Sequence, residues 1–353
     1  MELSIFEEGG IKIKAYKAEI PEHAPVFYNP KMAFDRRISV EIAKLFKPKE
    51  MLDGLCATGI RGLLYAKNLP DAFVVLNDID KKAINLAKRN AALNKIKNVE
   101  FSNEDVNKLL SKKRFDWIDI DPFGSPAYFL DSAARAIRNN GIIAFTATDV
   151  ATLANTYPKT CQRRYGIKLF KTDFEKEIAV RVLLSFAIKV FSKYEIALLP
   201  LLCYYSMHYV RCYCLARKSG RALDKLFEEF DFFSYCPKCL NREKGIEKVC
   251  KNCGSKMLIG ERIYLGNYFD LPTCQKLKEK LKGSEQEKLL ETICNEERVP
   301  FYYDIHKLSR VYKKSPKKIE HFIEKIKASR THFCNTGIKT QEPYSEIIKI
   351  LKM

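Results

Sequence analysis

An aspartate, a proline and an aromatic ring follow one another at the end of a strand-like segment of this sequence. In the stretch FDWIDIDPFGSP, Asp121, Pro122 and Phe123 come directly after an alternating apolar run. Pro122 fixes its own φ and favours an extended backbone at Asp121, which directs the carboxylate out of the sheet edge. A carboxylate beside a flat ring suits a planar substrate with an exocyclic amine, because the ring can stack on the base. The alternative is an ordinary Pro-Gly turn after a strand.

The chemistry predicted for Asp121 is activation of such an amine. The amine is a poor nucleophile, because its lone pair is delocalised into the ring. Hydrogen bonds to a carboxylate and a backbone carbonyl draw the nitrogen towards tetrahedral geometry and free that lone pair. The same carboxylate can take up the proton released after attack.

A second candidate site is the loop MLDGLCATGIRG, which joins a predicted strand to a helix. Its small residues let a ligand approach the backbone, and the helix start offers free N–H groups. Gly54, Gly59 and Gly62 lack the G-x-G-x-x-G spacing, which disfavours a nucleotide-dependent dehydrogenase. Asp78 follows the next predicted strand, where the partner of a ribose hydroxyl is expected, and Asp105 follows the third. Either aspartate could instead form a turn or cap a helix.

The elements that position these groups alternate along the chain. Strand-like and helix-like segments alternate through residues 40–150, which predicts a doubly wound, parallel, Rossmann-like sheet. A further helix is expected at 173–191, and strands that complete the sheet at 196–217. The composition then changes, so we expect an α/β domain at 1–220 and a smaller C-terminal α+β domain at 221–353.

The charge of the chain indicates a polyanionic partner. Its 353 residues carry 62 Lys and Arg against 43 Asp and Glu, a net charge of +19, which favours nucleic acid or an anionic membrane surface. The apolar run IALLPLLCYY is too short to span a membrane, and the acidic start MELSIFEEGG does not resemble a signal peptide. We therefore expect a cytoplasmic protein, with no obligate protein partner evident.

Four cysteines have the spacing of a metal site. Two C-x-x-C pairs are separated by ten residues, and a Cys₄ zinc ribbon has this pattern. The predicted ligands are Cys236, Cys239, Cys250 and Cys253. Because all four positions are filled, the Zn²⁺ would be structural. An iron–sulfur cluster remains a minor alternative.

The C-terminal part contains a basic module. Residues 304–340 hold ten Lys or Arg and three acids. Two short helices, the second capped by Ser315 with Pro316 at its first position, and a hairpin suggest a winged-helix-like fold. A solvated surface is the alternative. The residues predicted to contact nucleic-acid phosphates are Lys313, Lys314, Lys317, Lys318 and Arg330.

Several motifs together resemble one known family. The sequence DPFGSP is similar to the (D/N)-P-P-(Y/F) signature of class I amino-methyltransferases. With DGLCATGIRG, NDID, FYNPKMAFDRRIS, CQRRYG and ASRTHFCNTGIKT, the chain closely resembles the tRNA guanine-26 N2,N2-dimethyltransferase family, as an archaeal member. The resemblance spans nearly the whole chain. It implies S-adenosylmethionine as methyl donor, tRNA as substrate, and two methyl transfers to one exocyclic N2.

The resemblance also implies roles for individual residues. Asp121 would be the catalytic carboxylate, Phe123 would stack on guanine, and Phe27 is a candidate for the second face of that stack. The donor would be held by Arg36, Asp53, Gly54, Gly59, Arg61, Asp78, Asp105 and Val106. The chain departs from the usual pattern at Leu55 and Ala57, which replace glycines, and at Arg37, where an acid is common.

Two other functions compete with this interpretation. An amino-methyltransferase acting on rRNA or DNA would use the same catalytic motif, although the C-terminal matches argue against it. A zinc-dependent RNA-binding protein without activity would not need Asp53, Asp78, Asp105 and Asp121.

Overall fold

The computed structural model describes residues 2–353, which form two compact units interleaved along the chain. The first unit comprises Met1–Thr146, Tyr213–Lys218 and Lys276–Glu287, and the second comprises Ala147–Cys212, Ser219–Gln275 and Lys288–Met353. These units do not coincide with the expected division at residue 220. That division separates a methyl-transfer part from an RNA-binding part of the chain, and it stays a prediction.

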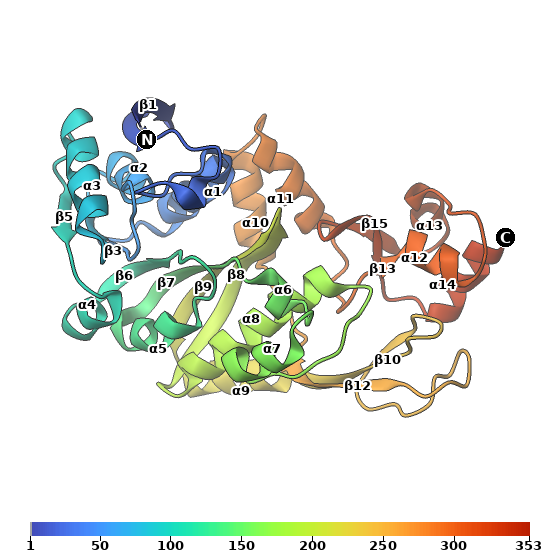
Figure 1. The fold of residues 1–353 in the computed structure, drawn as a ribbon. Coiled ribbons are helices and arrows are strands. Elements are labelled where there is room, and N and C mark those ends of the chain that lie inside the picture. The colour runs from blue at the N-terminus through green and yellow to red at the C-terminus, as the bar shows by residue number, and fades with distance from the viewer. Residues whose placement is uncertain (1) are drawn as a thin grey trace. The chain divides into compact units, whose positions relative to one another are not determined.

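The first unit begins with a hairpin and continues with alternating helices and strands. Its elements are β1 (Leu3–Glu8), β2 (Ile11–Tyr16), the short 3-10 helices η1 (Pro21–His23) and η2 (Pro30–Met32), α1 (Ala33–Phe46), β3 (Glu50–Asp53), α2 (Ile60–Asn68), β4 (Phe73–Asn77), α3 (Lys81–Leu93), β5 (Val99–Ser102), α4 (Val106–Lys112), β6 (Phe115–Ile120), α5 (Ala127–Ala136) and β7 (Ile137–Ala147). In Figure 1, α4 and α5 lie on one side of the sheet, and α2 and α3 lie on the other.

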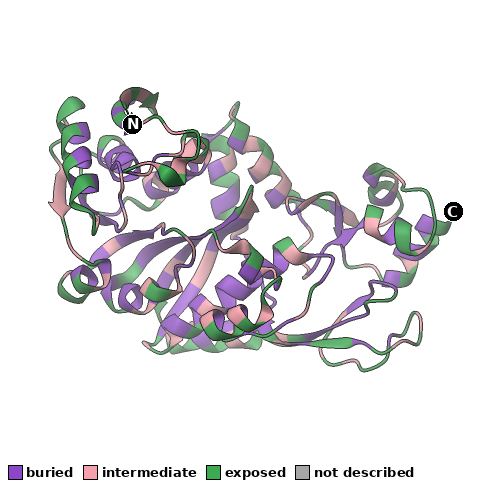
Figure 2. Ribbon diagram, viewed as in Figure 1, coloured by how far each residue is buried: buried purple, intermediate pink, exposed green. Residues whose placement is uncertain are grey.

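The largest sheet has seven strands in the order β5-β4-β3-β6-β7-β9-β8. The pairs β3–β4, β3–β6, β4–β5 and β6–β7 are parallel. Strands β4 and β6 are buried along nearly their whole length, as expected where helices cover both faces. Figure 2 shows the central strands of the sheet mostly as buried residues. The predicted mixed α/β fold with a mostly parallel central sheet is confirmed.

The parallel register sets the position of the candidate site. Asp53 at the end of β3 pairs with Leu76 of β4 and with Asp119 of β6. Because parallel strands end at the same edge of a sheet, the loops after β3, β4 and β6 emerge together. This edge is where open α/β sheets bind their ligands.

The second unit contains the remaining helices and two small sheets. Its elements are α6 (Val150–Leu153), α7 (Pro158–Tyr165), α8 (Glu175–Ser192), β8 (Ile196–Ser206), β9 (Tyr209–Lys218), α9 (Gly220–Glu228), β10 (Phe230–Tyr235), β11 (Arg242–Lys244), β12 (Leu258–Tyr264), α10 (Leu271–Lys280), α11 (Glu285–Asn295), β13 (Tyr303–Asp304), α12 (Ile305–Val311), α13 (Ile319–Lys325), β14 (Ala328–Thr331), β15 (Cys334–Thr340) and α14 (Tyr344–Lys352). Three of these elements, β9, α10 and α11, are shared with the first unit. The small sheets have the orders β11-β10-β12 and β13-β15-β14.

The basic module differs from the prediction at one helix start. The hairpin β14–β15 forms as expected, but α13 begins at Ile319, and Ser315 caps no helix. The segment 315–318 has no buried apolar side chain, since its Pro316 is exposed, whereas Ile319 and Phe322 are buried. A short helix is stabilised by packing of its apolar face more than by local propensity, so the helix starts where that face starts.

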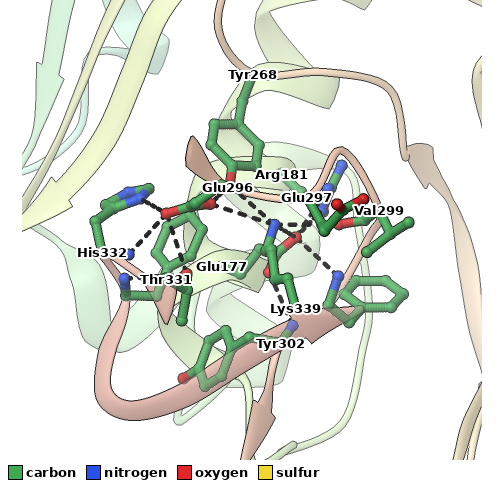
Figure 3. A network of polar contacts seen from close by, with 12 residues as sticks. Glu177, Arg181, Tyr268, Glu296, Glu297, Val299, Tyr302, Thr331, His332 and Lys339 are labelled. Atoms are coloured by element: carbon green, nitrogen blue, oxygen red, sulfur yellow. Dashed lines mark hydrogen bonds and ion pairs between the residues drawn. The ribbon is translucent and has the colours of Figure 1, made fainter. Parts of the chain in front are cut away.

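A buried ionic network lies within the second unit (Figure 3). Lys339 Nζ lies 3.1 Å from Glu177 Oε1 and 3.7 Å from Glu296 Oε2, and Arg181 also pairs with Glu177 at 2.8 Å. His332 Nδ1 lies 2.6 Å from Glu296 Oε1. Burial alone would raise the pKa of Glu296, but His332 and Lys339 outweigh it and hold that pKa at about 2. The carboxylates of Glu177 on α8 and Glu296, just beyond α11, are balanced by the guanidinium of Arg181 and the ammonium of Lys339 on β15, which lets the interior hold these charges.

Among residues 2–353, no helix is long and apolar enough to cross a membrane.

Candidate active site and metal centre

The carboxylate of Asp121 stands just beyond the carboxyl end of β6. The strand ends at Ile120, and the side chain of Asp121 is 23% exposed. Its Oδ2 accepts a hydrogen bond from Arg61 Nη2. Its Oδ1 has no hydrogen-bond partner within residues 2–353, so one acceptor oxygen remains for a ligand.

Arg61, in the first turn of α2, connects Asp121 to a buried polar cluster. Its Nη1 donates to Asp35 Oδ2 and to Ser39 Oγ, both at 2.8 Å, and its Nε lies 3.9 Å from Asp119 Oδ2. The Arg61 side chain is only 6% exposed. The guanidinium therefore donates hydrogen bonds to protein groups of α1 and to Asp121 just beyond β6.

Asp53, the last residue of β3, is a buried acid whose pKa is raised. Its Oδ2 accepts the Gly62 N–H at 2.8 Å. Burial raises the pKa of Asp53 to about 7, and the charge of Asp119 acts in the same direction, while Arg61 and the Gly62 N–H oppose them. Near neutral pH the negative charge of Asp53 is thus easily lost, unless a cation binds beside it.

The glycines after β3 permit close packing of the loop. Gly59 has φ of +80°, and a Cβ there would lie 2.9 Å from the Ala87 Cβ. A Cβ at Gly62 would lie 2.8 Å from Leu76. A Cβ at Gly54 would lie 3.1 Å from the Asp119 carbonyl oxygen. The loop keeps its conformation because these positions lack side chains.

The carboxylates of Asp78 and Asp105 have different hydrogen-bond partners and different places in the fold. Asp78 directly follows β4, where its Oδ2 accepts the Ala57 N–H and its Oδ1 the Asp80 N–H, both at 2.9 Å. Burial raises the pKa of Asp78, against these two N–H bonds. Asp105 lies three residues beyond β5 and caps α4, whose first residue is Val106. The helix-cap alternative therefore describes the local role of Asp105.

Phe27 and Phe123 lie against each other. Their ring centroids are 4.8 Å apart, with the planes at 83°. Phe123 is 66% exposed, and the Gly124 that follows it has φ of +84° with open space around it. The structure thus brings together both predicted stacking residues.

Arg36 forms a bidentate ion pair with Glu8. Its Nε and Nη2 each lie 2.6 Å from a Glu8 carboxylate oxygen, and Nη2 also donates to the Asn29 carbonyl. Its Nη1 has no partner within residues 2–353. One donor of the buried guanidinium is thus left for a ligand.

The four predicted cysteine ligands form a compact cluster. All four Sγ atoms lie within 4.8 Å of one another, with Cys236–Cys253 and Cys239–Cys250 at 3.5 Å. Tetrahedral zinc with Zn–S bonds of about 2.3 Å requires thiolates separated by roughly 3.8 Å. The cluster fits such an ion, and no His or carboxylate of residues 2–353 joins it.

The predicted phosphate-contacting residues do not form one helix face. Lys313 and Lys314 follow α12, and Lys317 and Lys318 precede α13. All are exposed except Lys317, which is half-buried. Arg330 of β14 forms an ion pair with Glu320, which competes with phosphate for this side chain.

Sequence reasoning missed the polar groups behind Arg61. Asp35, Ser39 and Asp119 are fully buried, and Tyr65 donates to Asp119 at 2.6 Å. The only local signal was an acid inside the apolar strand WIDI, because a buried carboxylate requires a partner.

A parallel doubly wound sheet whose carboxyl edge presents a glycine-containing loop, Asp78 and Asp121 is characteristic of class I methyltransferases. A family model described as N2,N2-dimethylguanosine tRNA methyltransferase matches residues 8–352. The chain belongs to this family.

Individual relatives support the assignment along the whole chain. A tRNA (guanine(26)-N(2))-dimethyltransferase from Pyrococcus abyssi is 35% identical over 99% of both chains. The enzyme of that name from Saccharolobus solfataricus is 36% identical over 94% of this chain and 92% of its own. The solved structure of Trm1 from Pyrococcus horikoshii, in complex with S-adenosyl-L-methionine, has a TM-score of 0.90 at 32% identity and covers 99% of this chain and 100% of its own.

Proposed function

We infer that this chain transfers a methyl group, and then a second, from S-adenosylmethionine to the exocyclic N2 of guanine 26 in tRNA. The observation that carries this inference is the family match over residues 8–352 together with Asp121 at the carboxyl edge of the sheet. We propose that the reaction takes place in the cytoplasm.

In the proposed mechanism, Asp121 acts on the amine of the target guanine. Its Oδ1 accepts an N–H and draws the lone pair of N2 out of conjugation with the ring. The N–C bond forms as the C–S bond breaks, the donor leaves as the neutral thioether, and the Asp121 carboxylate takes up the proton that the amine loses. Phe123 and Phe27 hold the flat base by ring contacts. The second transfer repeats these steps on the remaining N–H.

The chain's own residues fit the methyl donor. S-adenosylmethionine supplies an electrophilic methyl group on a positively charged sulfur. Asp53 favours that charge, Asp78 suits the ribose hydroxyls, and the free Nη1 of Arg36 suits a carboxylate. The backbone near Gly54 and Gly59, with Asp105 and Val106 beside the adenine, would complete the donor site. Arg61, in the first turn of α2, would help to hold the donor.

The second unit is proposed to bind tRNA. The support is the net charge of +19 and the exposed lysines of the basic module. We propose that Zn²⁺ held by the four cysteines is structural, because the four clustered thiolates can supply every ligand that a tetrahedral zinc ion takes.

Asp121→Asn tests the proposal. The variant should bind S-adenosylmethionine as the wild type does but lose most methyl transfer, because an amide is a poorer acceptor and takes up no proton. Mass spectrometry of tRNA nucleosides measures the transfer, and calorimetry measures the donor affinity. Near-normal turnover would remove the carboxylate from the mechanism.

rRNA and DNA assayed beside tRNA test the substrate class. Methylation of either in preference to tRNA would overturn the substrate assignment.

A further inference from the structure

We propose that the outer face of α7 is an RNA-binding surface, on which Lys159 and Arg163 contact phosphates of the tRNA backbone and Tyr157 stacks on a base. The inference rests on the proposed function and adds a contact surface to it. The helix contains most of the motif CQRRYG, which neither the donor site nor the cysteine cluster uses.

The inner face of α7 is anchored within the second unit. Arg164 Nη1 lies 2.6 Å from Asp149 Oδ2, and Tyr165 Oη donates to Asp149 Oδ1 at 2.7 Å. The Tyr165 ring packs edge to face on Phe186 of α8, with centroids 5.5 Å apart (Figure 1). Cys161 is buried, and burial raises the pKa of its thiol to about 12, so the thiol packs and does not react. Half of the motif is thus structural.

The outer face of α7 carries only positive charge. Lys159, Gln162 and Arg163 are exposed and follow one another at helical spacing, so they share one side of the helix. No acid occurs between Asp149 and Asp173. Neither cation of this face forms an ion pair within residues 2–353, so both are available to a ligand. Solvated helix faces commonly alternate charges of both signs, whereas a face with one sign fits a polyanion.

An exposed aromatic ring stands beside these cations. Tyr157 directly precedes α7 and is 58% exposed, whereas Tyr165 at the other end of the helix is buried. Surfaces that bind unpaired nucleotides combine such rings with cations, because the ring stacks on a base while the cations hold its phosphates. Beyond Gly166, which ends the helix, Lys168 and Lys171 are also exposed. The composition of this face therefore suits RNA more than a small anion.

The strand order places the start of this segment at the catalytic edge of the sheet. Strand β7 pairs in parallel with β6, with Phe145 opposite Ile120. The chain therefore leaves β7 at the edge where Asp121 follows β6. A base pocket holds one nucleotide, and contacts to backbone phosphates set the register of the strand that carries it. We place the phosphates bound by α7 close to the target guanine for this reason.

The test is the double variant Lys159→Ala/Arg163→Ala. Its Kd for tRNA should rise roughly tenfold or more, and the slope of log K against log salt should become shallower by about two units. Calorimetric affinity for S-adenosylmethionine should not change, and kcat at saturating tRNA should stay within about twofold, because the lost contacts bind substrate and transition state alike.

The matched control is Arg89→Ala/Lys97→Ala. It removes one exposed arginine of α3 and one exposed lysine just before β5, so the net charge falls by the same amount. This control should keep the wild-type affinity for tRNA and the wild-type salt slope. An equal loss in both double variants would mean that only the overall charge matters, and would overturn the inference.

Tyr157 is tested separately by a conservative pair. Tyr157→Ala should raise KM for tRNA severalfold, while Tyr157→Phe keeps the ring and should behave as the wild type. Equal values for both variants would remove the ring from the contact.

A Lys159→Ala/Arg163→Ala variant with wild-type Kd and salt slope would overturn the phosphate contacts, even though the wild type methylates tRNA. A wild type that methylates no tRNA would instead contradict the proposed function itself.

Discussion

Phe27 and Phe123 meet edge to face, with ring centroids 4.8 Å apart and planes at 83°. A base held between two parallel rings needs a gap of about 7 Å, twice the usual stacking distance. The two rings therefore occupy the space that a stacked guanine would take. Because Phe123 is 66% exposed, its ring is the one free to turn. On the proposed stacking role of the two rings, capture of the base would need rotation of the Phe123 side chain.

Phe123→Ala should lower kcat/KM for tRNA, because the loss of stacking removes about 1–3 kcal/mol of binding free energy for the base. Donor affinity should not change. Phe27→Ala should act in the same direction. The matched control is Phe73→Ala, an exposed ring at the start of β4 and so at the opposite edge of the sheet. An equal loss in the control, or no loss at Phe123, would remove these rings from base capture. Steady-state methylation assays decide between the outcomes.

Donor binding should depend on the protonation of Asp53. The pKa of this acid is raised to about 7, so below that pH it carries mostly a proton and gives little attraction to a sulfonium cation. The affinity for S-adenosylmethionine should therefore rise by roughly tenfold per pH unit between pH 5.5 and 7 and level off above. The neutral product S-adenosylhomocysteine should show no such dependence. Calorimetry at several pH values measures both affinities, and the same titrations on Asp53→Asn are the control. An equal response of the two ligands to pH would contradict the prediction.

The same shift has a consequence for stability with a definite sign. A carboxyl group whose pKa is raised on folding binds its proton more tightly in the native state, so its contribution is present at low pH and is lost as pH rises from about 4 to 7. Asp53→Asn should remove this part of the pH dependence of the free energy of unfolding, as denaturant titrations would measure.

Asp78→Ala should raise the Kd for S-adenosylmethionine, because the loss of a ribose hydroxyl contact removes about 1–3 kcal/mol of binding free energy. The Asp78 carboxylate also accepts the Ala57 and Asp80 N–H groups, so the loop itself must be controlled. Asp80→Ala removes a nearby helix-capping carboxylate and should leave the affinity almost unchanged. If both variants lose affinity equally, Asp78 only shapes the turn.

One zinc per chain should be found by elemental analysis, since the four clustered thiolates can supply all the ligands of one tetrahedral ion. Cys236→Ser should lose the metal and loosen residues 221–270 in hydrogen exchange, while the sheet domain stays folded, because the binding energy of a structural metal is folding energy for its module. Cys334→Ser, outside the cluster, is the control. Iron in the wild type, or a folded wild type without metal, would contradict the assignment.

Replacement of Lys313, Lys314, Lys317 and Lys318 by Ala should weaken tRNA binding and flatten its salt dependence. Each lost phosphate contact removes roughly one unit of slope in log K against log salt. Donor affinity should not change. A fourfold control removes the same charge at exposed lysines of α10 and α11 and the turn between them: Lys276, Lys280, Lys282 and Lys288. An unchanged salt slope in the first variant would mean that this segment does not hold the RNA.

The sequence by itself determined the order of the elements and the positions of the reactive groups. Local rules suffice for both: apolar runs bounded by turn residues predict strands, Pro122 directs Asp121, and the C-x-x-C spacing predicts a metal site. These features depend on residues close together in the chain. The same locality explains why α13 was predicted to start too early, because its start depends on where Ile319 and Phe322 find a core.

The tertiary structure alone decided which groups are partners. Arg61 meets Asp121 from 60 positions away, and Lys339 meets Glu177 from 162 positions away. No local pattern encodes such pairs, since each forms only when the packing of helices and strands removes both charges from water. Arg61 illustrates this: the resemblance implies that it helps to hold the donor, and only the fold shows that its guanidinium also contacts Asp35 and Asp121 and lies near Asp119.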